Sequence, residues 1–204
     1  MDRDGTLVHA RHYPRRPQDL ELVEGIGPEM SRLRSAGFEL IMVTNQSGLA
    51  RGYFGLADLQ RMHDSLASRL AALQAPLDAI YFCPHHVDGI VPGLSVDCPC
   101  RKPRPGMLLD AARERDLVMD HCWFVGDILD DVEAGRRAGC RTVLVDLATE
   151  ASPTEMLRRP HFVARDTPHA LRIIQRVERV ASPRVDLSYT PQSWNVSGAA
   201  YASH

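Results

Sequence analysis

The sequence predicts an α/β fold in which a central parallel sheet carries helices on both faces. Two observations predict this fold. Short apolar runs, typical of strands buried on both faces, alternate along the chain with segments in which apolar residues recur every three or four positions, as in amphipathic helices. Small polar and acidic residues follow several of the apolar runs, which is where an open α/β sheet places its ligands.

The composition favours one globular domain. The chain has 204 residues, of which 44% are hydrophobic and 25% charged, and its formal net charge is −2. This length supports one sizeable core, and the small net charge argues against a general nucleic-acid-binding surface. No apolar run approaches a membrane span, and the N-terminus carries no signal-peptide pattern. We therefore expect a cytoplasmic monomer without membrane or nucleic-acid partners.

The chain begins with two carboxylates one residue apart, in the sequence Asp2-Arg3-Asp4-Gly5-Thr6. In an extended segment the two carboxylates point to the same side. Two ionised carboxylates this close repel each other, so we expect a cation between them or a proton on one of them. The pattern suits phosphoryl transfer, in which one carboxylate attacks and the other moves protons. For the motif taken alone we would favour an Asx-type turn, and the downstream motifs reverse that preference.

The first half of the chain predicts two helices and two strands. A basic loop with several prolines, residues 7–25, either meets an anionic substrate or is a solvated surface. A proline near the start and a glycine just past the end frame a helix over residues 29–36. The apolar run 38–43 predicts a buried strand, apolar spacings of three and four predict a helix over 58–73, and a short apolar run predicts a strand over 77–82.

Polar residues follow the first strand directly, in the sequence Thr44-Asn45-Gln46-Ser47-Gly48. Small polar residues continue a sheet poorly, but they can hold an anion at the end of a strand. An ordinary strand-to-helix turn is the alternative for this segment on its own.

Three thiols and an imidazole lie close together after the second strand. Cys83 and His85 are two residues apart, as are Cys98 and Cys100. Two such pairs match a structural zinc site with three cysteines and one histidine, which would tie down the loop between them. His86 is an alternative fourth ligand, and the matched spacing favours His85. Reduced cysteines beside an incidental histidine are the other interpretation.

Arg101 and Lys102 follow the last of these cysteines. Lysine is rare in this chain, and Lys102 is attached directly to the loop that the metal would hold rigid. A lysine held in this way can neutralise a phosphate oxygen and a neighbouring carboxylate. A surface lysine is the alternative interpretation.

The second half of the chain continues the alternation of helices and strands. Residues 106–116 read as a helix, residues 122–125 as a buried strand, residues 132–138 as a helix and residues 141–145 as a strand after a glycine turn. A last strand and helix are predicted over 161–164 and 168–180.

Asp127 comes directly after the strand at 122–125. Carboxylate oxygens are natural magnesium ligands, and a strand end is where an α/β sheet places them. Asp130 and Asp131 follow closely, and either can instead cap the next helix; for Asp130 we prefer the capping role.

These pieces together resemble the haloacid dehalogenase (HAD) superfamily of phosphohydrolases. The acidic motif at residues 2–6, Thr44, Lys102 and Asp127 stand in the chain order of that superfamily. The Val43-to-Gly52 stretch, the Cys/His set and the sequence Cys-Arg-Lys-Pro narrow the resemblance to the zinc-containing D,D-heptose 1,7-bisphosphate phosphatases, whose near relative is the histidinol-phosphatase domain. The resemblance covers residues 1–180, and we expect residues 181–204, rich in Ser, Pro and Ala, to be a flexible tail.

The resemblance implies a Rossmann-like three-layer sandwich with little or no cap domain, and a Mg²⁺-dependent phosphatase. Asp2 would attack phosphorus and become an aspartyl phosphate, while Asp4 would protonate the leaving alcohol and then activate water. Thr44 and Lys102 would hold the transferring oxygens. The implied Mg²⁺ ligands are Asp2, the backbone carbonyl of Asp4, and Asp127. The implied substrate-binding residues are Thr44, Asn45, Gln46, Ser47, Arg101 and Lys102. The zinc would be structural, with the ligands Cys83, His85, Cys98 and Cys100.

The chain departs from the family at its start. In the family a buried strand precedes the first aspartate, and this chain offers only Met1 there. Either the assigned start lies too far downstream or the sheet lacks its central strand, and we favour the first explanation.

Three functions follow from these patterns. Removal of the 7-phosphate from D-glycero-D-manno-heptose 1,7-bisphosphate, in carbohydrate metabolism, is favoured by the sequence of residues 47–52. A phosphatase for histidinol phosphate or another small sugar phosphate is the second. The missing strand motivates the third, a catalytically weak, zinc-stabilised binding module.

Overall fold

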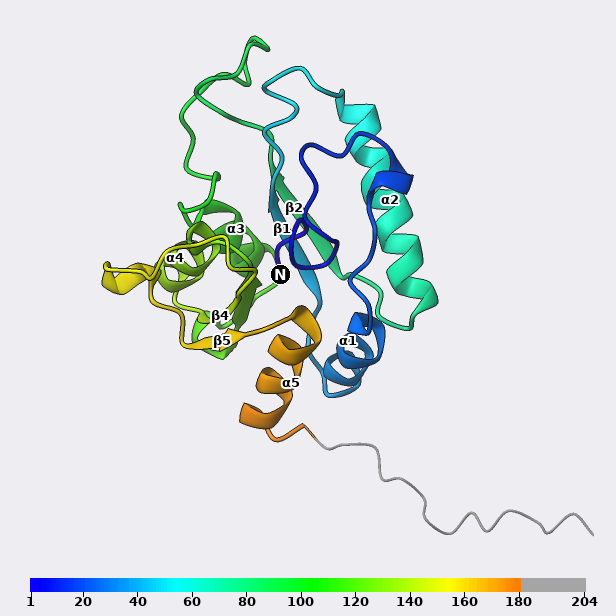
Figure 1. Cartoon of the computed structure of the whole chain (residues 1–204), viewed down its shortest axis with the longest axis vertical. Coiled ribbons are helices and arrows are strands. Elements are labelled where there is room, and N and C mark those ends of the chain that lie inside the picture. Colours follow the sequence, from blue (N-terminus) through cyan, green and yellow to red (C-terminus); the bar gives the residue numbers. More distant parts are fainter. Residues whose placement is uncertain (181–204) are drawn as a thin grey trace, which may run out of the picture.

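The computed structural model describes residues 1–180, in which helices and parallel strands alternate along the chain (Figure 1). The predicted tail, residues 181–204, lies outside the described residues. None of the helices in the described part is long and apolar enough to cross a membrane.

The first half of the chain contains the two predicted helices and two predicted strands. The helices are α1 (Ile26–Ser35) and α2 (Leu56–Ala72), and the strands are β1 (Ile41–Asn45) and β2 (Ala79–Cys83), with a short 3₁₀ turn η1 (Pro17–Asp19) before them. Helix α1 begins three residues earlier than predicted, because Gly25, at φ +75°, turns the chain into it. Strand β1 begins later than predicted, because Leu40 and Asp78 join the two strands by hydrogen bonds ahead of the ladder.

The second half also follows the predicted order. Its elements are α3 (Gly106–Glu114), η2 (Met119–His121), β3 (Trp123–Gly126), α4 (Leu129–Ala138), β4 (Arg141–Val145), η3 (Met156–Arg158), β5 (Phe162–Ala164) and α5 (Thr167–Val177). Strand β4 has the predicted bounds. Helix α5 begins where the Asp166 side chain accepts a hydrogen bond from the backbone N–H of His169, as an N-cap residue does.

The predicted parallel sheet is divided into two pieces. One piece pairs β1 with β2, and the other has the order β3-β4-β5; all pairs are parallel. Met1 and Asp2 lie between the pieces. Met1 bonds to Ile41 and Val43 of β1 through its nitrogen and carbonyl oxygen, at 2.7 and 2.9 Å, and the Asp2 N–H donates to Val125 of β3 at 2.9 Å. Two residues thus stand where a full strand would join the pieces.

A cavity of about 500 Å³ continues the line of Met1 between β1 and β3. Its walls are largely apolar and come from both strands and from helices on both faces, including Ile41, Phe124, Leu108 and Leu171. The volume lies where the residues of a central strand ahead of Met1 would pass.

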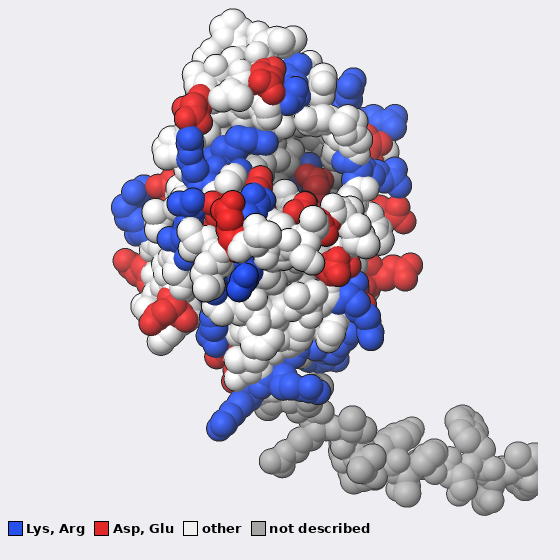
Figure 2. Space-filling model, turned by 60° about the vertical axis from the view of Figure 1, so that its left-hand side comes forward, with Lys and Arg blue, Asp and Glu red and all other residues white. Residues whose placement is uncertain are grey.

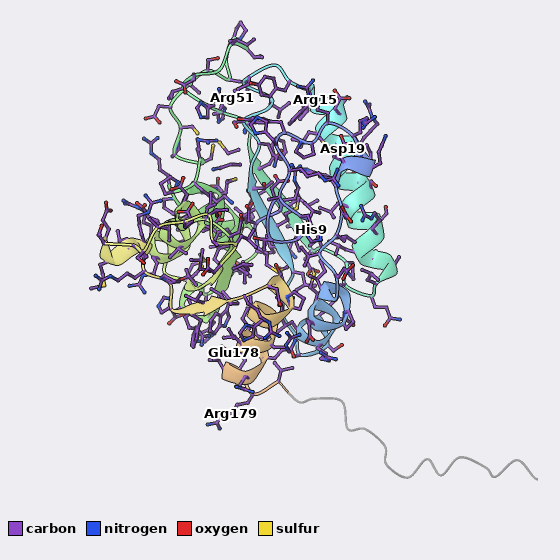
Figure 3. All side chains as sticks on the ribbon, in the orientation of Figure 1. His9, Arg15, Asp19, Arg51, Glu178 and Arg179 are labelled. Carbon is purple, nitrogen blue, oxygen red and sulfur yellow. The ribbon has the colours of Figure 1, made fainter. Side chains whose placement is uncertain are left out.

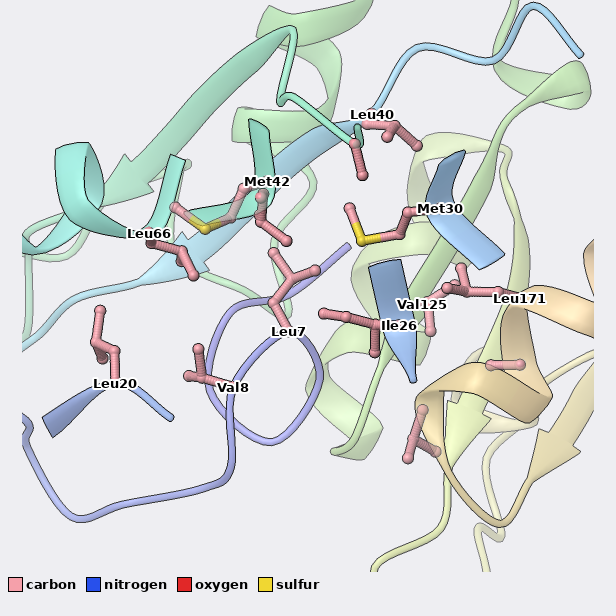
Figure 4. Close-up of a cluster of buried hydrophobic side chains, with 14 of the residues drawn as sticks. Leu7, Val8, Leu20, Ile26, Met30, Leu40, Met42, Leu66, Val125 and Leu171 are labelled. Atoms are coloured by element: carbon pink, nitrogen blue, oxygen red, sulfur yellow. The ribbon is translucent and has the colours of Figure 1, made fainter. Parts of the chain in front are cut away.

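The helices form two outer layers, as predicted. Alternate residues of the strands face opposite sides: Met42 and Val125 join the larger apolar cluster with α1, α2 and α5, while Val43 and Phe124 join a second cluster with α3 and α4. Figure 4 shows Leu7 at the centre of the larger cluster, next to Met42 and facing side chains from α1. The N-terminal loop is therefore anchored in the core directly behind its acidic motif.

Candidate active site

The four predicted catalytic pieces converge at the carboxyl ends of the strands. Asp2 follows the short Met1 connection, Thr44 lies in β1, Asp127 follows β3, and Lys102 precedes α3. Lys102 is the only lysine in the chain and its side chain is 2% exposed. Its Nζ lies 2.8 Å from Asp2 Oδ1 and 2.5 Å from Asp131 Oδ1, and it donates a hydrogen bond to the carbonyl oxygen of Val43 at 3.2 Å.

Asp131 is a site residue that sequence reasoning left as a possible helix cap. It does accept a hydrogen bond from the N–H of Ile128, as a residue of the first helical turn does, but its other oxygen faces Lys102. Its position in the first turn of the helix that follows Asp127 is the signal that could have placed it in the site. Asp130 instead forms an ion pair with Arg158 at 2.7 Å, so the capping role predicted for Asp130 is wrong, and Asp131 accepts the capping hydrogen bond.

The carboxylates of Asp2, Asp127 and Asp131 form a cluster that fits a divalent cation. One oxygen from each lies within 4.8 Å of the others, and all three residues are buried. Lys102 pairs with two of the three carboxylates, so the cluster would carry an excess of two negative charges if all three were ionised. Burial and the neighbouring carboxylates raise the pKa of Asp127 to about 8, and burial raises that of Asp131 to about 6. Oxygen ligands with this charge match Mg²⁺.

Two glycines allow the chain to approach these carboxylates closely. A Cβ atom at Gly5 would stand 2.1 Å from an oxygen of Asp127, and one at Gly126 would stand 2.2 Å from the Cβ of Asp131. Gly5 also has φ +77°, a conformation that other residues rarely adopt. The hydroxyl of Thr6 donates to Asp127 at 3.4 Å. The Gly-Thr pair of the N-terminal motif thus positions Asp127.

Asp4 is held by two groups on one side of the site. Arg3 contacts both carboxylate oxygens of Asp4, the shortest contact being 2.8 Å from Nη2 to Oδ2. The side-chain amide of Gln46 also reaches Oδ2 at 3.2 Å, and it donates to the hydroxyl of Thr44 at 2.9 Å. Thr44 and Asp4 are therefore connected through Gln46.

The other predicted substrate-binding residues take different positions. The Asn45 side chain bonds to the backbone N–H and C=O of Lys102, both at 3.1 Å, so it fixes Lys102 in place. Ser47 lies 3.5 Å from the Tyr13 hydroxyl. Arg101 donates to the carbonyl oxygen of His85 at 3.4 Å, which attaches it to the Cys/His loop.

A cavity of about 220 Å³ opens beside Asp4 and extends the site away from the carboxylate cluster. Its lining includes Arg3, Asn45, Gln46 and Ser47, together with Arg11, His12 and Tyr13 of the predicted basic loop. Part of the predicted basic loop therefore lies beside Asp4, where Arg11 itself pairs with Glu21 at 3.0 Å.

Charge of both signs surrounds the site. The face in Figure 2 is hollowed in its upper half, with acidic atoms inside the hollow and basic side chains around it. Figure 3 places Arg15 and Arg51 at the end of the molecule opposite Glu178. Arg15 lies over the ring of Tyr53, 5.4 Å from its centroid, and Arg51 contacts His86 at 3.1 Å.

The Cys/His set comes together as predicted. Sulfur atoms of Cys83, Cys98 and Cys100 lie 3.2 to 3.5 Å apart, and Nδ1 of His85 lies 3.3 Å from the sulfur of Cys100. All four ligand atoms lie within 4.8 Å of one another. Three thiols and an imidazole around one point fit a tetrahedral zinc ion. His86 instead faces Arg51, which supports His85 as the fourth ligand.

Comparison with known proteins gives matches along most of the chain. A family model described as HAD-hydrolase-like matches residues 99–170. The D-glycero-beta-D-manno-heptose-1,7-bisphosphate 7-phosphatase of Photorhabdus laumondii is 34% identical over 179 residues, which cover 86% of this chain and 95% of that protein. The protein of the same name in Escherichia coli (strain K12) is 39% identical over 154 residues, covering 75% of this chain and 81% of that protein.

The fold also matches solved structures of phosphatases. The D,D-heptose 1,7-bisphosphate phosphatase of B. bronchiseptica, complexed with magnesium and phosphate, has a TM-score of 0.72 and 33% identity, and the match covers 86% of this chain and 96% of that chain. A putative HAD-like phosphatase of Mesorhizobium loti has a TM-score of 0.76 and 31% identity, covering 90% of this chain and 86% of that chain. The predicted three-layer fold is thus confirmed.

Proposed function

The chain belongs to the HAD family of phosphohydrolases, in the group of the heptose 1,7-bisphosphate phosphatases, and from this premise we propose that it removes the 7-phosphate of D-glycero-D-manno-heptose 1,7-bisphosphate. It is a phosphomonoesterase. The observation that carries the proposal is the convergence of Asp2, Lys102 and Asp127 at the carboxyl edge of the sheet, beside a cavity that reaches the basic loop.

Each side chain has a role in the proposed reaction. Asp2 attacks phosphorus, and the bond from phosphorus to the sugar oxygen breaks as the bond to Asp2 forms. Asp4 gives a proton to the departing oxygen and then removes one from the water that hydrolyses the aspartyl phosphate. Lys102, which lies against Asp2, neutralises one phosphate oxygen, and the hydroxyl of Thr44 donates to another.

Asp2, Asp127 and the backbone carbonyl of Asp4 would hold the Mg²⁺ ion, with Asp131 beside them. When bound, the ion neutralises charge that the carboxylates and the phosphate cannot otherwise share. Lys102 already faces two of these carboxylates, so the buried cluster is partly neutralised before substrate binds.

The substrate assignment is tested by comparing kcat/KM for heptose 1,7-bisphosphate with kcat/KM for histidinol phosphate. We expect a clear preference for the bisphosphate, because the cavity beside Asp4 leads to Arg11 and His12, which suit a second phosphate. A preference for histidinol phosphate would overturn the assignment and leave the phosphatase chemistry intact. An absence of phosphatase activity with either substrate would favour the binding module.

We also propose that Cys83, His85, Cys98 and Cys100 bind a structural zinc ion. Four protein ligands leave no open position for catalysis. Chelation of zinc is expected to lower Tm by about 5 °C or more, because the metal closes the loop between residues 83 and 100. Activity is also expected to fall, because Arg101 and Lys102 directly follow the ligand Cys100 and would lose their fixed positions when the loop is released. Full activity and an unchanged Tm after zinc loss, verified by elemental analysis, would contradict this role.

A further inference from the structure

Arg3 is a buried charge that the proposed chemistry does not use. Its side chain is 1% exposed, although it lies between the two aspartates of the N-terminal motif. A buried guanidinium is costly unless its donors are all satisfied. Arg3 satisfies them in two directions: Nε and Nη2 reach both oxygens of Asp4, and Nη1 reaches Nε2 of His63 at 3.4 Å.

His63 comes from a different part of the fold. It lies in α2, is 3% exposed, and packs its ring edge-on to Phe82 of β2 with centroids 5.8 Å apart. Figure 1 shows the N-terminal loop passing beside α2, which brings Arg3 to this histidine. The helix and strand therefore fix the ring against which Arg3 rests.

The histidine can only be the acceptor of this contact. A guanidinium has donors and no acceptor, so Nε2 of His63 must carry a lone pair and the ring must be neutral. Burial, together with the charge of Arg3, lowers the pKa of His63 to about 4, which keeps the ring neutral at physiological pH.

We infer that Arg3, held from behind by His63, is a positioning residue that orients the carboxylate of Asp4 for proton transfer to the leaving oxygen. This rests on the proposed function of Asp4. A planar fork that contacts both oxygens fixes the plane of the carboxylate, which a lysine at the same place would not do. Gln46 adds one further contact to the same carboxylate. His63 acts indirectly, because its contact with Nη1 fixes the orientation of the Arg3 guanidinium.

The test uses two substrates that differ in their need for a proton. An alkyl phosphate, here heptose 1,7-bisphosphate, releases an alkoxide unless Asp4 protonates it, whereas p-nitrophenyl phosphate releases a stable phenolate. In the His63→Phe variant the acceptor is lost while an aromatic ring is kept. We expect kcat/KM for the alkyl phosphate to fall about 10-fold to 100-fold, as part of the contribution of a general acid, and kcat/KM for the aryl phosphate to change much less. The value of kcat/KM reports the step that forms the aspartyl phosphate, whereas hydrolysis of that intermediate, in which Asp4 also acts, is common to both substrates.

Two further variants separate positioning from general destabilisation. His63→Gln keeps an oxygen acceptor for Arg3 and is expected to restore most of the lost alkyl rate. His161→Phe is the matched control: His161 also contacts an arginine, Arg136 at 2.9 Å, but it lies away from the site, and this variant is expected to leave the ratio of alkyl to aryl rates unchanged. If His63→Phe does not fold, the comparison is made with His63→Gln and Arg3→Lys, and Arg3→Lys is expected to lose the alkyl rate selectively.

Equal losses with both substrates, or an unchanged ratio in every folded variant, would overturn the inference. A wild-type protein that hydrolyses p-nitrophenyl phosphate but not heptose bisphosphate would instead overturn the proposed substrate. In that case any alkyl phosphate that the wild type cleaves serves for the same comparison.

Discussion

Asp2→Asn is expected to lower the rate of phosphate-ester hydrolysis by a factor of about 10³ or more, with no loss of folding stability. The amide is a poor nucleophile, so the covalent step through Asp2 is lost. Stability is expected to stay the same or to rise, because the substitution removes one of three carboxylates that are buried together. Phosphate release and Tm, measured on the same preparation, check both parts.

Asp130→Asn is the matched control for this prediction. Asp130 lies in the same region but pairs with Arg158 outside the carboxylate cluster, so its variant is expected to keep its activity. Beryllofluoride should form an adduct on Asp2 in the wild type and none in Asp2→Asn. Unchanged activity in Asp2→Asn would exclude the covalent mechanism through Asp2.

An added strand of about five apolar residues in front of Met1 is expected to raise Tm by about 6–12 °C. The cavity of about 500 Å³ between β1 and β3 has apolar walls on both faces, so every residue of such a strand would bury its side chain. Burial of these side chains stabilises the fold more than ordering the added backbone costs, and we expect the free energy of unfolding to rise by about 3 kcal/mol. The extension also replaces the buried amino group of Met1, whose pKa burial lowers to about 5, with a peptide N–H.

The control is an extension of equal length made of alternating Gly and Ser, which can pair with the strands but cannot fill the cavity. It is expected to change Tm little. The apolar extension should also raise kcat, because it fixes Asp2 more firmly against Lys102. Equal effects of the two extensions on Tm would show that the cavity does not accept a strand.

The fold and most of the site could be predicted because their signals are local. Alternating apolar runs predicted each helix and strand within a few residues, and short motifs pointed to Asp2, Asp4, Lys102 and Asp127. The Cys/His set was identifiable because two pairs of residues at matched spacing are typical of a zinc site.

The remainder depends on contacts between distant segments. His63 lies on the apolar face of α2, four residues after Leu59 and three before Leu66, but only the packing of α2 against the N-terminal loop brings it to Arg3. Asn45 resembled a substrate ligand, yet its side chain bonds to the backbone of Lys102, 57 residues later. The division of the sheet also depends on pairing partners, since β1 and β3 have ordinary strand sequences.

Of the described residues, only Met1 and Asp2 lie between the two sheet pieces near the site, so catalysis depends on how the two pieces are positioned relative to each other. Thr44 belongs to one piece and Asp127 to the other, while Asp2 is bonded to both through its own backbone and that of Met1. A small relative shift of the pieces would separate the phosphate-binding and metal-binding groups while every helix stayed intact. On gentle heating, we therefore expect enzymatic activity to be lost at a lower temperature than the helical signal in circular dichroism.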